Sequence, residues 1–112
     1  MTDGVTTITY PVSDLAKALF RALLGVEPDM DQPYCVGYRV AGQDIAPDPN
    51  GHVQGMTGPV AYWNVADIEA TATALVDAGA ETVQAAKDVG GGKLVASFKD
   101  ADGNMIGLIQ PA

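Results

Sequence analysis

The sequence contains a single cysteine, a single histidine and only six basic residues. Cys35 has no second thiol with which to form an internal disulfide, a CxxC redox pair or a cysteine metal site. Six lysines and arginines against fourteen aspartates and glutamates give a net charge of −8, which disfavours binding to nucleic acid and to anionic membrane surfaces. The first residues lack the pattern of a signal peptide, and no apolar run is long enough to cross a bilayer. We therefore expect a cytoplasmic protein with neither nucleic acid nor membrane as a partner.

The rest of the composition is that of a globular protein. Apolar residues make up 47% of the 112 positions and charged residues 18%, which predicts one domain with a core of its own. The chain also repeats a pattern, because Ile8–Leu15 and Ala61–Ile68 both place an aspartate between a β-branched or aromatic stretch and an apolar-periodic segment. Two copies of one supersecondary unit are therefore expected.

Each copy contains one predicted helix. The first runs from about residue 14 to residue 24, with Ser13 or Asp14 as its N-cap, and the second begins after the N-cap Asp67 and stops at Gly79. The apolar spacing predicts two buried helix faces. They are Leu15, Ala18, Leu19, Ala22 and Leu23 in the first helix, and Ile68, Ala72, Leu75 and Val76 in the second.

Short strands are predicted after each helix, at 26–29, 34–40 and 43–46 in the first half and at 81–85, 93–98 and 105–110 in the second. The turn signals between them are Ala41-Gly42, Gly90-Gly91-Gly92 and Asp102-Gly103-Asn104. Each half therefore has the order βαβββ, and the proline- and glycine-rich stretch 47–59 is predicted to connect the halves without regular structure. We expect a first module at about 3–47, a connector at 48–58 and a second module at about 59–112.

Paired βαβββ units with V-x-D-[LI] at the start of each helix resemble the vicinal oxygen chelate superfamily, the group of glyoxalases, bleomycin-resistance proteins and extradiol dioxygenases. The most specific segments are Val60–Ile68 and Asp100–Gln110, together with Gly90-Gly91-Gly92 before Leu94-Val95-Ala96. The resemblance covers essentially the whole chain. It implies an α+β fold in which two modules form a curved mixed sheet around a cup, with the helices on the convex side and a small-molecule site in the cup.

In metal-dependent members of that superfamily the ligands lie on the first and last strands of the modules. The equivalent positions in this sequence are Thr7, Val60, Ala46 and Gly107. None of these side chains is a useful ligand for a divalent cation, so we expect neither a metal ion nor another cofactor. The single histidine, His52, lies in the connector and is interpreted as a solvated loop residue.

Strand alternation sorts the remaining candidates by face. If Thr7 and Val60 point into the cup, Thr9, Tyr62 and Asn64 do so too, and Trp63 is a core residue on the opposite face. A two-residue turn at Ala41-Gly42 pairs Arg39 with Asp44, and Gly107 leaves space on the last strand. The candidate ligand-binding residues are Thr7, Thr9, Arg39, Asp44, Tyr62, Asn64, Met105 and Gly107.

Asp67 is explained by helix capping, and Asp100 and Asp102 by turn chemistry, so no catalytic acid/base pair is identified. The leading hypothesis is a bleomycin-resistance-like protein that binds a small organic molecule without a metal ion. One alternative is an enzyme of the same superfamily, such as a lyase, isomerase or dioxygenase, with a shifted ligand set of His52 and Asp44 or with metal-free catalysis by Tyr62 or Arg39. Another is an interaction module with a vestigial cup. Because open sheets leave edges to be covered, a homodimer is expected.

Overall fold

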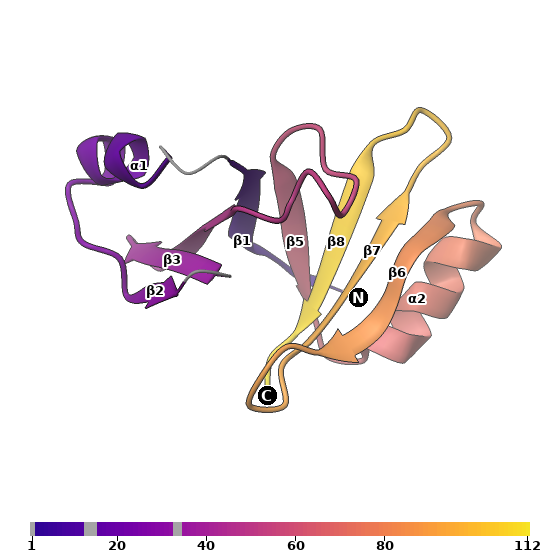
Figure 1. Ribbon diagram of the computed structural model, residues 1–112. Coiled ribbons are helices and arrows are strands. Elements are labelled where there is room, and N and C mark those ends of the chain that lie inside the picture. Colours follow the sequence, from indigo (N-terminus) through magenta and orange to yellow (C-terminus); the bar gives the residue numbers. More distant parts are fainter. Residues whose placement is uncertain (1, 13–15, 33–34) are drawn as a thin grey trace. The chain divides into compact units, whose positions relative to one another are not determined.

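The computed structural model describes residues 2–12, 16–32 and 35–112 (Figure 1). Its contacts divide the chain into two compact units. We call Thr6–Val60 the N-terminal unit, and Met1–Val5 together with Ala61–Ala112 the C-terminal unit. The elements follow the predicted order: β1 (Thr2–Pro11), α1 (Ala16–Leu24), β2 (Met30–Gln32), β3 (Cys35–Val40), β4 (Gln43–Asp48), β5 (Val60–Val65), α2 (Ile68–Asp77), β6 (Glu81–Asp88), β7 (Leu94–Lys99) and β8 (Met105–Gln110).

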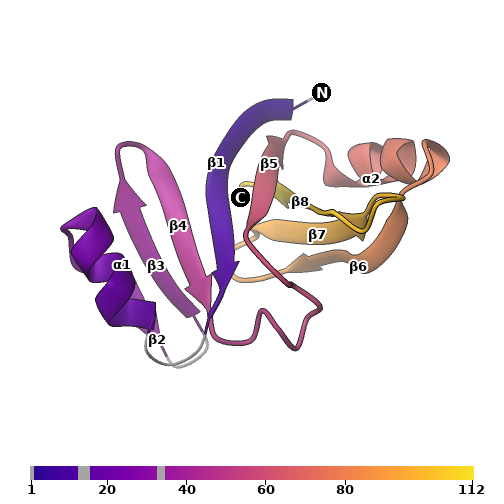
Figure 2. The ribbon, with the colours of Figure 1, turned by 90° about the horizontal axis from the view of Figure 1, so that it is seen from above.

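The N-terminal unit contains a mixed sheet in the order β2-β3-β4-β1 (Figure 2). Strand β1 is parallel to β4, and the other neighbours are antiparallel. The turn between β3 and β4 consists of Ala41 and Gly42, whose φ angles are 52° and 78°. Two consecutive left-handed residues are the geometry of a tight two-residue hairpin, so the turn predicted from the sequence is confirmed.

Helix α1 covers this sheet with a different face from the one predicted. Leu19 and Leu23 are 67% and 74% exposed, whereas Phe20 is buried and Leu24 packs against the core. The Phe20 ring lies with its centroid 5.0 Å from that of Tyr10. The aromatic side chain thus supplies the core contact, and the helix is rotated by one residue from the predicted face. Residues 13–15, which include the predicted N-cap, lie outside the described residues. The core of the unit comprises Phe20, Val36, Tyr38 and Ile45, with Ile8, Tyr10, Val12, Leu24 and Val40 packed against it.

The strand predicted at 26–29 is wrong, because pairing with β3 begins only after Pro28. Proline has no N–H to donate, and the first bond of this region runs from the Asp29 N–H to the Gly37 carbonyl at 2.8 Å. Strand β4, in turn, continues through Pro47 into the predicted connector. Its pairing with β3 reaches only to Ile45, so beyond that residue a proline is tolerated as it is on an edge strand.

The rest of the connector is a packed turn. The Met56 N–H donates to the Gly51 carbonyl at 3.0 Å, and the Asn50 N–H donates to Oδ1 of Asp48 at 2.8 Å. Gly51 is so close to β1 that a Cβ there would lie 2.8 Å from the Cα of Pro11. The connector is therefore held against the end of β1 by backbone contacts that only glycine permits.

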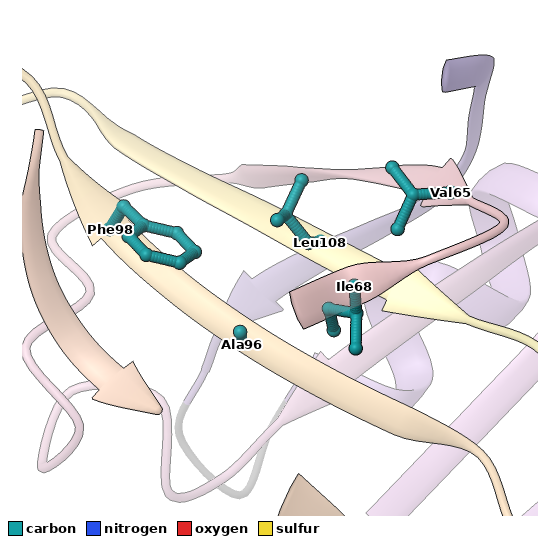
Figure 3. Packing of buried hydrophobic residues seen from close by; sticks show 5 residues of the cluster. All are labelled: Val65, Ile68, Ala96, Phe98 and Leu108. Atoms are coloured by element: carbon teal, nitrogen blue, oxygen red, sulfur yellow. The ribbon is translucent and has the colours of Figure 1, made fainter. Parts of the chain in front are cut away.

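In the C-terminal unit the strands have the order β5-β8-β7-β6, with β5 parallel to β8. Helix α2 begins as predicted, because Oδ1 of Asp67 accepts a bond from the Ala70 N–H at 3.0 Å. It ends at Ala78, before Gly79 with φ of 108°. The core, drawn in Figure 3, comprises Val65, Ile68, Ala96, Phe98 and Leu108. The first residues of β1 join this unit, where the Thr2 hydroxyl donates to the Asn64 carbonyl at 2.6 Å.

Two residues predicted to be buried in this unit lie at the margin of its core. Trp63 is 39% exposed and Val76 is 47% exposed. Helix α2 packs over β6, β7 and β8, so Trp63 on β5 lies beyond the area that the helix covers.

Strand β6 is longer than predicted and is interrupted by register shifts around Gln84. Such bulges protect an edge strand from further pairing.

The hairpin between β7 and β8 is organised by one carboxylate. Oδ1 of Asp100 accepts bonds from the N–H groups of Asp102 at 2.9 Å and Asn104 at 2.8 Å, and Oδ2 accepts from Nδ2 of Asn104 at 2.9 Å. These bonds, led by that from the Asn104 side chain, lower the pKa of Asp100 from its ordinary 3.8. The turn role predicted for Asp100 is confirmed.

The α+β class and the two βαβββ modules predicted from the sequence are thus confirmed. Neither helix in the described part of the chain has the length and apolar character needed to span a membrane.

Candidate functional site

The candidate residues lie on the sheet faces that point away from the two core clusters. In β1, Ile8 and Tyr10 pack into the core of the N-terminal unit, so the alternating Thr7 and Thr9 are on the other side of the sheet. We call these surfaces the helix-opposite faces. In the N-terminal unit the face carries Thr7, Thr9, Arg39, Asp44 and Ala46, and in the C-terminal unit it carries Tyr62, Asn64, Ser97, Lys99, Met105 and Gly107.

One row across the N-terminal sheet brings together three of the predicted residues. Asp44 on β4 is the register partner of Thr7 on one side and of Arg39 on the other. Nε of Arg39 donates to Oδ1 of Asp44 at 3.0 Å, which confirms the predicted pair. The side chains are 68% and 41% exposed, and an ion pair so well solvated contributes at most about 1 kcal/mol to stability. The guanidinium therefore remains accessible to a ligand.

The neighbouring row on this face carries small side chains. Thr9 on β1 pairs with Ala46 on β4, and Thr9 is only 7% exposed. Gly37 on β3 follows the same alternation, because its neighbour Tyr38 is in the core. The row offers a shallow floor with one hydroxyl and little side-chain volume.

The helix-opposite face of the C-terminal unit is dominated by the contact between Tyr62 and Gly107. The two residues are register partners on β5 and β8. A Cβ built on Gly107 would lie 2.5, 2.6 and 2.7 Å from Cδ2, Cγ and Cε2 of Tyr62. The aromatic ring therefore lies directly over the glycine backbone. The space that the sequence left free at Gly107 is taken by the Tyr62 ring.

Three polar residues on this face were missed by the sequence analysis. Ser97 on β7 is the partner of Gly107, Gln84 on β6 is the partner of Ser97, and Lys99 follows Ser97 on the same side of β7. Ser97 is 5% exposed. The signal that could have found Ser97 and Lys99 is the pairing across the Asp102-Gly103-Asn104 turn, because that turn fixes which residues of β7 and β8 are opposite each other. Gln84 on β6 has no such signal, because register shifts on both sides interrupt its pairing.

Asn64 and Met105, the other two predicted residues of this unit, lie on the same face but in other rows. Asn64 pairs with Ile109, and Met105 pairs with Lys99. Both side chains are partly buried. They flank the Tyr62–Gly107 row on opposite sides.

The positions that correspond to metal ligands do not fit a divalent cation. Thr7 offers a neutral hydroxyl, and Val60, Ala46 and Gly107 offer no side-chain donor. The ring of Tyr62 also lies where a side chain at position 107 would begin. Within residues 2–12, 16–32 and 35–112 there is no group of three or more histidine, cysteine, aspartate or glutamate side chains able to hold a metal ion.

For the alternative pair of His52 and Asp44, the described residues supply no third histidine, cysteine, aspartate or glutamate to complete a metal site. His52 is exposed in the connector turn, and Asp44 is engaged by Arg39. The site chemistry that the described residues offer is therefore stacking, hydrogen bonding and a few charges.

Comparison with known proteins finds one family along most of the chain. The model of the Glyoxalase/Bleomycin resistance protein/Dioxygenase superfamily matches residues 4–108. A member of that superfamily from Vibrio splendidus has a solved structure with 17% identity and a TM-score of 0.71, and the match covers 94% of this chain and 97% of that one.

Two enzymes of known name are also similar in structure. The Mn(II)-bound glyoxalase from Novosphingobium aromaticivorans has 14% identity and a TM-score of 0.71, over 97% of this chain and 39% of that one. A variant of methylmalonyl-CoA epimerase from Streptomyces coelicolor has 14% identity and a TM-score of 0.69, over 100% and 96%. No curated protein sequence matches. At these identities the likeness establishes the fold, and function must be argued from the site.

Proposed function

The chain belongs to the Glyoxalase/Bleomycin resistance protein/Dioxygenase superfamily, and we propose that it binds a small organic molecule without a metal ion and without transforming it. The observation that carries the proposal is the Tyr62 ring lying over Gly107 on the helix-opposite face of the C-terminal unit. One face of the ring rests on the Gly107 backbone, which fixes the orientation of the ring, and we propose that a planar ligand makes its aromatic contact with Tyr62. Offset stacking of this kind contributes about 0.5–1.5 kcal/mol beyond the area that it buries.

The groups around the ring are suited to binding. Asn64 and Ser97 are polar, and Met105 offers a polarisable apolar contact. A few convergent polar groups around an apolar or aromatic surface are typical of small-molecule sites. Considered by itself, the helix-opposite face of the N-terminal unit offers the hydroxyls of Thr7 and Thr9 and the Arg39–Asp44 pair.

The proposal of metal-free binding rests on the residues at the ligand positions. Three of the four carry no donor atom, and the fourth is a threonine. No cluster of titratable side chains on the described faces supplies a substitute set. The residues of the site are therefore those of a binding protein, and no observation favours one particular reaction.

A titration with planar and non-planar probes tests the proposal. Phenol and cyclohexanol are added to the ¹⁵N-labelled protein, and the amide shifts of the two sheets are followed. We expect phenol to shift the amides around Tyr62 and Gly107 and cyclohexanol to have a much smaller effect. Tyr62→Leu should abolish the difference, whereas Trp63→Leu, which removes a half-exposed ring on the other side of β5, serves as the matched control.

Equal shifts with both probes, or an unchanged response in Tyr62→Leu, would contradict stacking on Tyr62.

Calorimetry with Zn²⁺, Mn²⁺ or Ni²⁺ tests whether the protein binds a metal ion. We expect no stoichiometric uptake at micromolar metal, and uptake of one ion per chain would overturn metal-free binding.

We also propose that two copies of the chain pair in the cytoplasm. The cytoplasmic location is supported by the single cysteine, which has no second thiol in this sequence with which to form a disulfide. Pairing is supported by Leu19 and Leu23, which lie one helical turn apart on α1 and are 67% and 74% exposed. Sedimentation equilibrium should give a dimer, and Leu19→Ser with Leu23→Ser should give a folded monomer. A dimer unaffected by both changes would place the interface elsewhere.

A further inference from the structure

We propose that Asn50 is a site of spontaneous deamidation, and that the isoaspartate formed there releases the connector from the end of β1. The inference concerns the N-terminal unit alone and is independent of the proposed function. Asn50 is followed by Gly51, whereas the other two asparagines, Asn64 and Asn104, are followed by a valine and a methionine. Because glycine has no Cβ, it leaves the backbone nitrogen after Asn50 the least hindered of the three.

The modification needs only the chain itself and water. The backbone nitrogen of Gly51 attacks Cγ of Asn50, so that a C–N bond forms and the side-chain nitrogen leaves as ammonia together with the proton of the Gly51 N–H. Water then opens the resulting succinimide ring at either carbonyl group. Opening at Cγ gives aspartate, and opening at the main-chain carbonyl gives isoaspartate. In isoaspartate the main chain runs through Cβ and Cγ and is longer by a CH₂ group.

The structure exposes the side chain of Asn50 but restrains the attacking nitrogen. Asn50 is exposed, and among the described residues no hydrogen-bond partner of its side chain is found. The Gly51 N–H donates to the Asp48 carbonyl at 3.1 Å, and the Asn50 N–H donates to Oδ1 of Asp48 at 2.8 Å. The nitrogen must lose its proton to attack, so the first of these bonds opposes the reaction. Deamidation therefore proceeds when the turn opens locally.

The isoaspartyl product does not fit the closed turn. Gly51 is packed so closely that a Cβ on it would lie 2.8 Å from the Cα of Pro11 and 3.2 Å from the Sδ of Met56. Met56 is itself held in place, because it is 3% exposed and its N–H donates to the Gly51 carbonyl at 3.0 Å. Protein interiors at this density have no room for an extra CH₂ group. Gly51 must therefore move away from Pro11.

This displacement reaches the end of β1 through Asp48. The Asp48 carbonyl accepts bonds from the N–H groups of Gly51 and Val12, each at 3.1 Å, and Asp48 is the register partner of Pro11. Deamidation also creates a carboxylate at position 50, and like charges so close to Asp48 repel each other. We therefore expect the connector and the end of β1 to loosen, while the C-terminal unit is unchanged.

Ageing at mildly alkaline pH tests the site, with a synthetic peptide of residues 47–57 aged beside the protein. Mass spectrometry with electron-transfer fragmentation locates the mass gain of deamidation and separates isoaspartate from aspartate. We expect Asn50 to react in the protein at a rate lower than in the peptide by about fivefold or more, because two hydrogen bonds must open first. Asp48→Ala, which removes one of these bonds, should raise the rate in the protein by about two- to tenfold and hardly change it in the matching peptide.

Amide hydrogen exchange tests the consequence. The isoaspartyl form is purified and compared with Asn50→Asp, which has the same charge but a main chain of ordinary length. We expect exchange at Val12 and Met56 to be about two- to tenfold faster in the isoaspartyl form, and exchange in α2 to be equal in both. Asn50→Gln, whose longer side chain closes a ring far more slowly, should age without this change.

Conversion of Asn64 or Asn104 ahead of Asn50, or an intact Asn50 when the peptide has fully reacted, would overturn the assignment of the site. Equal rates in protein and peptide would refute the restraint by the turn. Equal exchange at Val12 and Met56 in the isoaspartyl form and in Asn50→Asp would show that the longer main chain fits the turn, and would overturn the release of the connector.

Discussion

Replacing Gly107 by alanine tests the contact on which the proposed site depends. A methyl group at this position would lie 2.5–2.7 Å from three atoms of the Tyr62 ring, whereas carbon atoms normally pack at about 3.5–4.0 Å. The ring must therefore move by about 1 Å. Overpacking of this kind destabilises proteins by about 1–3 kcal/mol.

The backbone contributes an effect of opposite sign. Gly107 does not adopt a positive φ, so alanine fits the strand and should stabilise it by about 0.5–1 kcal/mol through the unfolded chain. In the wild-type background we expect Gly107→Ala to lower the free energy of unfolding by up to about 2.5 kcal/mol. In the Tyr62→Ala background the same change should raise it, because the ring is gone. The coupling between the two positions should therefore be about 1–3 kcal/mol.

Urea denaturation of the four proteins in this double-mutant cycle measures the coupling. Unfolding is followed by far-UV circular dichroism and by the fluorescence of Trp63, which is the only tryptophan and lies next to Tyr62 on β5. Agreement of the two signals verifies a two-state transition. If Gly107→Ala has the same effect with and without the Tyr62 ring, the ring does not lie over Gly107 and the stacking platform does not exist.

Three further predictions concern the framework of the site. Phe20→Ala should destabilise the protein by about 3–5 kcal/mol. Leu23→Ala, at a side chain 74% exposed in the single chain, should stay within about 0.5 kcal/mol when unfolding in urea is measured at concentrations at which the chain is monomeric. Equal losses would mean that α1 buries the other face. Gly51→Ala should lower the free energy of unfolding by about 1–3 kcal/mol, because its methyl group would lie 2.8 Å from the Cα of Pro11. Gly58→Ala should be near neutral, because a methyl group there has no atom within 4 Å. Thermal unfolding measures both. Because its pKa is lowered in the folded state, ionised Asp100 stabilises the fold above pH 3.8, and this contribution is lost as the pH falls through the lowered pKa; an NMR titration giving an unshifted carboxyl would refute this.

The sequence predicted best where a local signal acts alone. The hairpin turn at Ala41-Gly42 and the last strand at 105–110 have the predicted positions, because positive φ and two-residue alternation are properties of a few neighbouring residues. The start of α2 at Asp67 is set by one side chain and the N–H groups next to it. Such features hardly depend on what packs against them.

The prediction failed where a choice depends on the partner surface. Apolar residues on α1 allow two adjacent faces, and the aromatic contacts of Phe20 with Tyr10 and Tyr38 select the one through Phe20 and Leu24. The width of sheet that α2 covers leaves Trp63 half exposed, although the face of β5 on which it lies was predicted correctly. The spacing of apolar residues in the sequence predicts neither the buried face of α1 nor the exposure of Trp63.

For the candidate site, too, some features could be predicted from the sequence and others required the folded structure. Strand alternation alone assigned Thr7, Thr9, Tyr62 and Asn64 to one side of their strands, because that assignment needs only a period of two. The cross-strand register, which only the folded strands define, put the Tyr62 ring over Gly107 and brought Ser97 and Gln84 into its row. The amino-acid sequence thus determined which groups are available for chemistry. Tertiary structure decided which of them meet, because contacts between residues far apart in the chain are fixed by pairing and packing and not by local preference.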